Sequence, residues 1–260
     1  FGFNNNTPSL YLADLLKQTL LMLIIGAPLI WGALTLMDST GDYWWLYLWA
    51  AWIGFAILMM WAYPAFIAPL FNKFTPLDDA SLQARVEALL ARCGFKSQGI
   101  YVMDGSRRSG HGNAYFTGLG NNKRIVFFDT LLKTLSEDQI EAVLAHELGH
   151  FRRKHVIKNM GVMAILSLIG LAILGWASAE SWFYTGLGVD TQSSAMALIL
   201  FMMVIPVFSF FLHPMMTGLS RKYEYEADAY AASVSNADDL IAALVALYQE
   251  NASTLTPDPL

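Results

Sequence analysis

Two histidines four residues apart, with a glutamate beside the first, are the residues of this chain best suited to chemistry. Residues 146–150 read His-Glu-Leu-Gly-His. On a helix, His146 and His150 lie one turn apart and point the same way, so their neutral imidazoles can bind one Zn²⁺ ion at roughly 2.0–2.1 Å. Glu147 can then take a proton from a water molecule that the metal activates. The pattern predicts a zinc hydrolase, and the plain alternative is an amphipathic helix that carries two histidines by accident.

The residues before this motif predict the helix that must position it. Ser136, followed three residues later by Gln139, forms a capping box, and Glu137 and Asp138 place negative charge in the first turn. Apolar residues then recur at steps of three and four, which gives the helix one buried side: Ile140, Val143, Leu144, Leu148 and Phe151. We therefore expect the motif in the middle of a helix that packs against a core.

A catalytic zinc site needs a third protein ligand, and the sequence offers several. Segment 220–232 is compatible with a helix, on which Glu224 and Asp228 are neighbours on one face. Glu224 can then bind zinc while Asp228 accepts a hydrogen bond from the second ring nitrogen of a ligand histidine. Glu226 points off that face, and an ordinary solvated helix is the alternative. The polar candidates outside the motif are Glu224, Glu226, Asp228, His111, His155 and His213.

The histidines among these candidates differ in their prospects. His155 lies five residues past His150, so on a continuous helix it faces away from the metal. We interpret it as part of the basic cluster Arg152–Lys158. His213, at a predicted membrane edge, is the second choice for the third ligand. His111 lies in a polar loop and has no predicted role beyond hydrogen bonding within that loop.

The composition predicts a membrane protein. Hydrophobic residues make up 55% of the 260 residues and charged residues only 14%, which excludes an ordinary soluble protein. A bilayer is crossed by about 20 apolar residues. Four stretches meet this requirement, and the second has tryptophans and tyrosines at both ends, as interfacial belts do. The stretches are Leu20–Met37, Trp44–Phe66, Met160–Ala177 and Ala195–Leu212.

The distribution of charge predicts the orientation. All sixteen lysines and arginines fall before the first apolar stretch, between the second and third, or after the fourth. The two short loops on the other side carry only acidic residues, namely Asp38, Asp42, Glu180 and Asp190. By the positive-inside rule, both ends and the central segment are cytoplasmic. The zinc site should therefore face the cytoplasm, close to the surface of an inner or internal membrane.

Other features narrow the class of protein. The single Cys93 excludes an intramolecular disulfide and, before Gly94, is interpreted as a packing residue. A net charge of −5 without a basic stripe argues against nucleic acid as a partner. The chain starts at Phe1 and its first apolar run lacks a small-residue cleavage site. We therefore expect a fragment of a longer protein rather than a precursor with a signal peptide.

Residues 72–159 have the pattern of a small α/β unit. Asp78 or Asp79 caps an expected helix at 80–92, and strands are expected at 98–103, 113–117 and 123–128, with a turn at 118–122. An exposed strand edge can pair with an extended peptide, and Asn113 and Ala114 are the candidates for that edge. A hairpin edge without a ligand is the alternative.

The expected organisation of the chain has four parts. Residues 1–71 form a flank and the first transmembrane hairpin, and residues 72–159 form the α/β metalloprotease unit. Residues 160–213 form the second transmembrane hairpin, and residues 214–260 form a cytoplasmic helix, which carries the third zinc ligand, and a flank.

Four motifs together resemble the type I CAAX prenyl proteases, which are integral-membrane zinc metalloendopeptidases of the gluzincin type. The resemblance extends over nearly all of the chain. The motifs are His146-Glu-Leu-Gly-His150, Glu224-x-x-x-Asp228, Asn113-Ala-Tyr-Phe-Thr-Gly118 and Lys123-Arg-Ile-Val-Phe-Phe-Asp-Thr-Leu-Leu132. The implied fold is a mainly α integral membrane protein with an inserted zincin-like α/β catalytic unit.

The resemblance also implies roles for individual residues. His146, His150 and Glu224 would bind one Zn²⁺ per chain, Glu147 would be the general base, and Asp228 would support a ligand or donate a proton. It further implies a membrane-enclosed chamber. The implied partners are the bilayer and a peptide or protein substrate, either a prenylated C-terminus or a membrane protein under quality control.

The sequence departs from the family pattern in two respects. Members have about seven spans, whereas four are counted here by length. The family pattern also continues past this C-terminus with a His-Pro-Pro block, whose histidine is thought to steady the oxyanion. An alternative from another class is a catalytically idle membrane scaffold in which zinc only joins two helices, which would need a closed site with four protein ligands.

Overall fold

The computed structural model describes residues 4–117 and 124–250 of the chain. The chain divides into two compact units, which are described separately. The sheet unit consists of the described parts of Phe1–Leu15, Met60–His155 and Tyr223–Leu260. The helical unit consists of Leu16–Met59 and Val156–Lys222.

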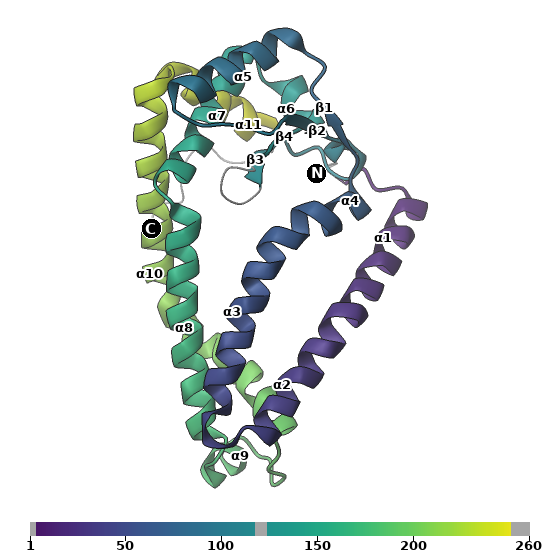
Figure 1. Ribbon diagram of the computed structural model, residues 1–260, viewed down its shortest axis with the longest axis vertical. Helices are drawn as coiled ribbons and strands as arrows, with labels where there is room; N and C mark the ends of the chain where they lie inside the picture. Colours follow the sequence, from purple (N-terminus) through teal and green to yellow (C-terminus); the bar gives the residue numbers. More distant parts are fainter. Residues whose placement is uncertain (1–3, 118–123, 251–260) are drawn as a thin grey trace. The chain divides into compact units, whose positions relative to one another are not determined.

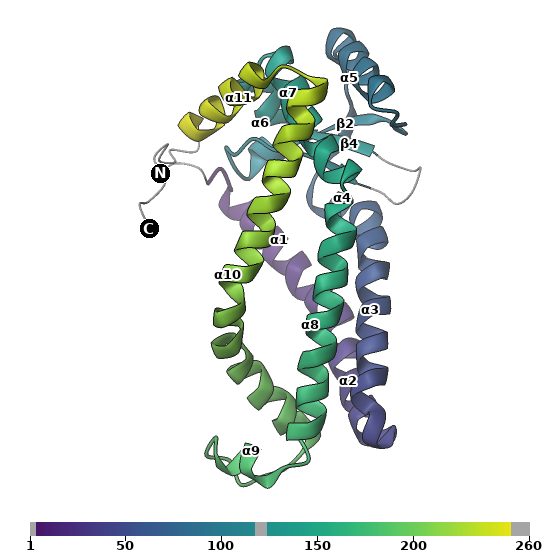
Figure 2. The same ribbon diagram turned by 90° about the vertical axis from the view of Figure 1, so that its left-hand side faces the viewer.

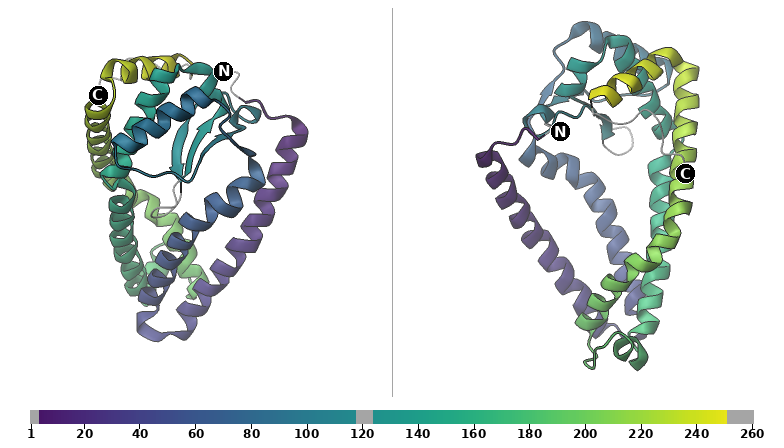
Figure 3. Two further views of the ribbon diagram at one scale, coloured as in Figure 1. Left: turned by 45° about the horizontal axis from the view of Figure 1, so that its top comes forward. Right: turned by 180° about the vertical axis from the view of Figure 1, so that it is seen from behind.

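The sheet unit contains four short strands, β1 to β4, in the order β1-β2-β4-β3. Strands β2 and β4 are parallel, with Ile100 opposite Ile125, and the other two pairs are antiparallel (Figure 3, left). Strand β3 is therefore at one edge of the sheet. The bounds are β1 Phe74–Pro76, β2 Ile100–Met103, β3 Ala114–Thr117 and β4 Arg124–Phe128.

The three strands expected from the sequence are confirmed to within two residues. Strand β1 was not predicted, because three residues that end in a proline give no alternating pattern. The predicted turn at 118–122 lies outside the described residues.

Helices α5, α6, α7 and α11 pack with the sheet around one hydrophobic core. The side chain of Asp79 caps α5 by accepting hydrogen bonds from two backbone amides, and the expected helix at 80–92 is confirmed. Ion pairs join α5 to α7, from Arg85 to Asp138 and from Arg92 to Glu141. The helices of this unit are α4 Ala68–Phe71, α5 Ala80–Arg92, α6 Asp129–Thr134, α7 Glu137–Arg152 and α11 Ala237–Glu250, with a 3₁₀ turn at Gly105–Arg107.

Helix α7 carries the His-Glu-Leu-Gly-His motif and begins as the sequence predicts. Ser136 accepts a hydrogen bond from the backbone of Gln139, whose side chain accepts one from the backbone of Ser136, so the capping box is complete. Ile140, Leu144 and Leu148 are buried on one side of the helix. This side fixes the rotation of α7 about its axis and thereby the direction in which the two histidines point.

The helical unit is built from helices long and apolar enough to cross a bilayer. Four such helices occur among the described residues, Pro8–Ser39, Gly41–Phe71, His155–Ala177 and Ser194–Val234, and each contains one predicted stretch. The fold class predicted from the sequence is therefore confirmed. The long helices and the elements between them are α1 Pro8–Leu21, α2 Ala27–Ser39, α3 Trp44–Ala62, α8 His155–Ala177, α9 Ser181–Thr185 and α10 Ser194–Val234, with π-helical turns at Met22–Gly26 and Tyr63–Ile67 and a 3₁₀ turn at Gly41–Tyr43. The residues of α1 up to Leu15, the turn Tyr63–Ile67 and the residues of α10 from Tyr223 onward belong to the sheet unit. Figures 1 and 2 show the short α9 in the connection between α8 and α10.

Helix α10 is a single helix of 41 residues that runs through both Pro206 and Pro214. From the sequence we expected a cytoplasmic helix and flank at 214–260. In the structure, the same helix contains the fourth membrane stretch and, near its C-terminal end, Glu224 and Asp228.

Candidate metal centre

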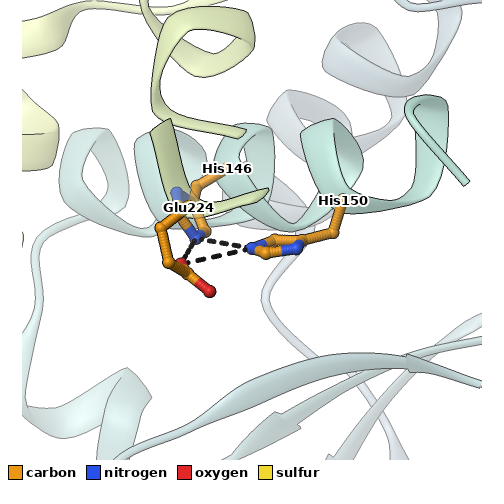
Figure 4. Close-up of side chains that lie close together, drawn as sticks. All are labelled: His146, His150 and Glu224. Atoms are coloured by element: carbon orange, nitrogen blue, oxygen red, sulfur yellow. Dashed lines mark hydrogen bonds and ion pairs between the residues drawn. The ribbon is translucent and has the colours of Figure 1, made fainter. Parts of the chain in front are cut away.

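Three side chains of the sheet unit converge on one point. His146 and His150 come from α7 and Glu224 comes from α10, and Figure 4 shows their polar atoms directed toward one another. The Nε2 atoms of the two histidines are 3.1 Å apart. The Oε2 atom of Glu224 lies 3.4 Å from each of these nitrogens. These three residues are the metal-ligand group found among the described residues.

The spacing of these three atoms fits a zinc ion. With bonds of roughly 2.0–2.1 Å, a tetrahedral ion holds its ligand atoms about 3.3 Å from one another. The observed separations of 3.1, 3.4 and 3.4 Å are close to this value. Three protein ligands leave the fourth tetrahedral position for a substrate or water, which is the arrangement of catalytic rather than structural zinc sites.

Asp228 fixes the orientation of His146. Its Oδ1 atom lies 2.8 Å from Nδ1 of His146, on the side of the ring away from the convergence point. A carboxylate only accepts hydrogen bonds, so Nδ1 of His146 must carry the proton. The lone pair of a neutral imidazole is then on Nε2, the atom that faces Glu224 and His150. Asp228 therefore selects the tautomer that can bind a metal.

The surroundings of His155 differ from the sequence-based interpretation. That interpretation assumed a continuous helix, but α7 ends at Arg152, and Lys154 has a positive φ of 57°. This break turns the chain, so that Nδ1 of His155 lies 3.1 Å from Nδ1 of His150. His155 is only 2% exposed and is not part of a solvated basic cluster.

Glu147 is partly buried beside the two histidines. Burial raises the pKa of its carboxyl group above the ordinary value, His146 opposes this shift, and the negative charge of Glu224 adds to it. Burial also lowers the pKa of His150, which favours the neutral imidazole that a metal ligand must be. A carboxylate with a raised pKa is a better proton acceptor than an exposed one, which suits a general base.

A direct backbone contact sets how closely α7 and α10 approach each other. A Cβ atom placed on Gly149 would lie 2.8 Å from Cα and 2.9 Å from the carbonyl oxygen of Ala227. Ala227 and Ala231 are fully buried. Both are small residues of the Glu224 segment, and no local pattern in the sequence indicates that Gly149 is their partner.

The predicted substrate residues lie where β3 begins. Asn113 precedes the strand and its backbone oxygen accepts a hydrogen bond from Phe128. Ala114 is buried and pairs with Phe127 of β4, and its backbone amide donates a hydrogen bond of 2.8 Å to Oδ1 of Asn113. Strand β3 packs against α7, the helix with the two histidines.

The other two candidate histidines, His111 and His213, are not part of the group formed by His146, His150 and Glu224. Nδ1 of His111 is 3.0 Å from the hydroxyl of Ser109, within the loop that precedes β3. His213 is an exposed residue of α10 in the helical unit. Sequence reasoning missed the pairing of His155 with Glu226, whose Oε2 atom is 3.1 Å from Nε2 of His155. Only the break at Lys154 could have indicated it, and lysine is not a residue that predicts a positive φ.

Comparison with known proteins gives matches over the whole chain. Residues 76–257 match the model of peptidase family M48, and residues 1–73 match the model described as CAAX prenyl protease N-terminal, five membrane helices. The chain is 39% identical to CAAX prenyl protease 1 homolog of Arabidopsis thaliana, over all of this chain and 61% of that protein. It is 37% identical to CAAX prenyl protease 1 of Saccharomyces cerevisiae, with the same coverage of both chains.

A solved structure also matches this chain over its whole length. The crystal structure of S. mikatae Ste24p superposes with a TM-score of 0.93 at 35% sequence identity, over all of this chain and 64% of that chain. The chain thus spans less than two thirds of the length of the relatives it matches.

Proposed function

The chain belongs to peptidase family M48, and from this premise and the geometry of its metal centre we propose that it is the catalytic part of a zinc-dependent endopeptidase. It lies in a multi-pass integral membrane protein, as its four apolar helices and its relatives indicate. The observation that carries the proposal is the convergence of Nε2 of His146, Nε2 of His150 and Oε2 of Glu224 at zinc-ligand spacing, with Glu147 next to the first ligand.

In the proposed mechanism, His146, His150 and Glu224 hold one zinc ion. The bound ion supplies Lewis acidity, which makes a water molecule acidic near neutral pH and polarises the scissile carbonyl group. Glu147 takes the proton of the attacking water on its carboxylate and then passes it to the leaving amine. Asp228 holds the proton on Nδ1 of His146 throughout and so keeps the other ring nitrogen directed at the metal.

We place the substrate along the outer edge of β3, the last strand of the sheet. An extended peptide there would form backbone hydrogen bonds with a strand that packs against the catalytic helix, and Asn113 and Ala114 lie where such pairing would begin. The substrate class we propose is the prenylated C-terminus of a membrane-associated protein. The names of the relatives support this class over general quality control of membrane proteins.

Removal and return of the metal tests this function. The full-length protein in detergent should hydrolyse a prenylated peptide that ends in a CAAX sequence. Dialysis against a zinc chelator should abolish this activity, and one equivalent of Zn²⁺ should restore it, because the three ligand atoms lie at the spacing of a zinc site. Hydrolysis that persists after the protein is shown to contain no metal would contradict the proposal.

A zinc-directed hydroxamate separates the enzyme from the scaffold alternative. An open fourth position should bind a peptide hydroxamate, which would inhibit hydrolysis and raise the melting temperature of the zinc-loaded protein. A closed structural site would do neither. A melting temperature that is unchanged at saturating hydroxamate would therefore favour the scaffold.

We further propose that the metal centre faces the cytoplasm. Because the basic residues flank the membrane stretches on one side only, Ser181 should be extracytoplasmic and Lys96 cytoplasmic. Both residues are exposed, so single cysteines at these positions in a Cys93→Ala background can react with an impermeant thiol reagent. In intact cells the cysteine at 181 should be labelled and the cysteine at 96 should be labelled only after permeabilisation. The reverse pattern would place the chemistry on the other side of the membrane.

A further inference from the structure

His155 makes three contacts that no ligand role explains, with His150, Glu226 and Tyr223. It is the first residue of α8, and its side chain is almost completely buried. Its Nδ1 atom is 3.1 Å from Nδ1 of His150, and its Nε2 atom is 3.1 Å from Oε2 of Glu226. Its ring also stacks on Tyr223, with the ring centres 4.2 Å apart and the planes 12° from parallel. A histidine with both nitrogens engaged and one face covered has a fixed orientation.

These contacts allow only one arrangement of protons when His150 binds a metal. Nε2 of His150 then offers its lone pair to the ion, so its Nδ1 carries the proton and donates it. Nδ1 of His155 must accept this hydrogen bond, and its proton is consequently on Nε2. That proton is donated to the carboxylate of Glu226, which can only accept. The directions of the two hydrogen bonds are consistent, from His150 to His155 and from His155 to Glu226.

We propose that His155 is a positioning residue that, together with Glu226, selects the tautomer and ring orientation with which His150 binds zinc. This inference rests on the proposed function. His146 has its own carboxylate, Asp228, at 2.8 Å, whereas His150 reaches Glu226 through the ring of His155. Partners of this kind raise the affinity of a ligand for its metal, and their removal typically lowers that affinity about 10- to 100-fold.

The backbone around His155 supports a specific role. On a continuous helix a residue five positions after His150 would point to another side. The chain instead ends α7 at Arg152, and Lys154 adopts a left-handed conformation that is uncommon for residues other than glycine. The break brings His155 back against His150, and the same site receives Tyr223 and Glu226 from α10.

Three substitutions of His155 separate the contribution of each nitrogen. Asparagine keeps a polar atom at the position of Nδ1, so its oxygen can accept the hydrogen bond from His150 but cannot reach Glu226. Glutamine keeps a polar atom at the position of Nε2, so it can contact Glu226 but not His150. Phenylalanine keeps the stacking on Tyr223 and loses both hydrogen bonds. Asparagine and glutamine lose the aromatic stacking equally, so their comparison is independent of it.

The readouts are the affinity for Zn²⁺, by competition with a chelator, and the visible spectrum of the Co²⁺-substituted full-length protein. We expect His155→Gln and His155→Phe to bind Zn²⁺ about 10- to 100-fold more weakly and to alter the Co²⁺ spectrum. His155→Asn should remain close to the parent protein in both. His213→Phe, which removes an exposed histidine of α10, is the matched control and should behave as the parent.

Each outcome decides the inference. Equal affinities for the asparagine and glutamine variants, or an unchanged affinity for all three, would show that the ring of His155 only fills space. If His155→Phe does not fold, judged by the melting temperature of the metal-free protein, the asparagine and glutamine pair still decides. Failure of the proposed function is distinguishable, because then the parent protein itself would bind no Zn²⁺.

Discussion

Replacement of Glu147 by glutamine should abolish peptide hydrolysis while leaving the zinc content at one ion per chain. Glutamine has nearly the same size and fits the same partly buried position, but its amide cannot take a proton from water. General base catalysis contributes about 10²- to 10⁴-fold to a rate, so kcat should fall by at least this factor. Glu147 is not one of the three proposed metal ligands, His146, His150 and Glu224, and metal binding should therefore persist.

The measurement is single-turnover hydrolysis of the peptide substrate, with metal content determined by plasma emission spectroscopy on the same preparation. Glu87→Gln makes the same chemical change on an exposed part of α5 and should leave both quantities unchanged. A Glu147→Gln protein that is fully loaded with zinc and hydrolyses peptide at the parental rate would exclude Glu147 as the base.

Replacement of Glu224 by alanine should remove the metal. The loss leaves only the two imidazoles of α7, and a site with two protein ligands holds zinc much more weakly than a site with three. After dialysis against buffer free of metal, we expect Glu224→Ala to retain far less than one equivalent of zinc and to show no hydrolysis.

Glu226→Ala is the matched variant, since it removes the same kind of side chain two residues away. The carboxylate of Glu226 contacts His155 and is not one of the three proposed metal ligands. Glu226→Ala should therefore carry one equivalent at saturating zinc, with an affinity reduced only through His155 and His150. Equal loss of metal from both variants at saturating zinc would mean that the third ligand has been assigned to the wrong side of α10.

Local patterns account for the parts of this structure that the sequence predicts well. The capping box at Ser136 and Gln139 involves residues three positions apart, and the membrane helices follow from uninterrupted apolar stretches. The spacing of Glu224 and Asp228 is also local, and it places both on the side of α10 that meets the two histidines. Each of these features depends on one segment of the chain alone.

The parts that the sequence could not predict depend on two segments meeting. The identity of Glu226 as the partner of His155 depends on a chain reversal at Lys154, a residue type that rarely adopts positive φ. Strand β1 forms only because Phe74 and Thr75 meet Met103 and Val102 of β2. Its own three residues have too little pattern to indicate a strand.

The contact between Gly149 and Ala227 has a consequence for how such motifs are recognised. Backbone atoms, which cannot move aside as flexible side chains do, touch at this position. The fourth residue of His-Glu-Leu-Gly-His therefore specifies a distance between two helices, while the ionisable residues specify a chemistry. A His-Glu-x-x-His match with a larger residue at this position could not take its third ligand from a helix packed this closely. The size of one uncharged residue is thus a criterion for separating true sites of this architecture from accidental matches.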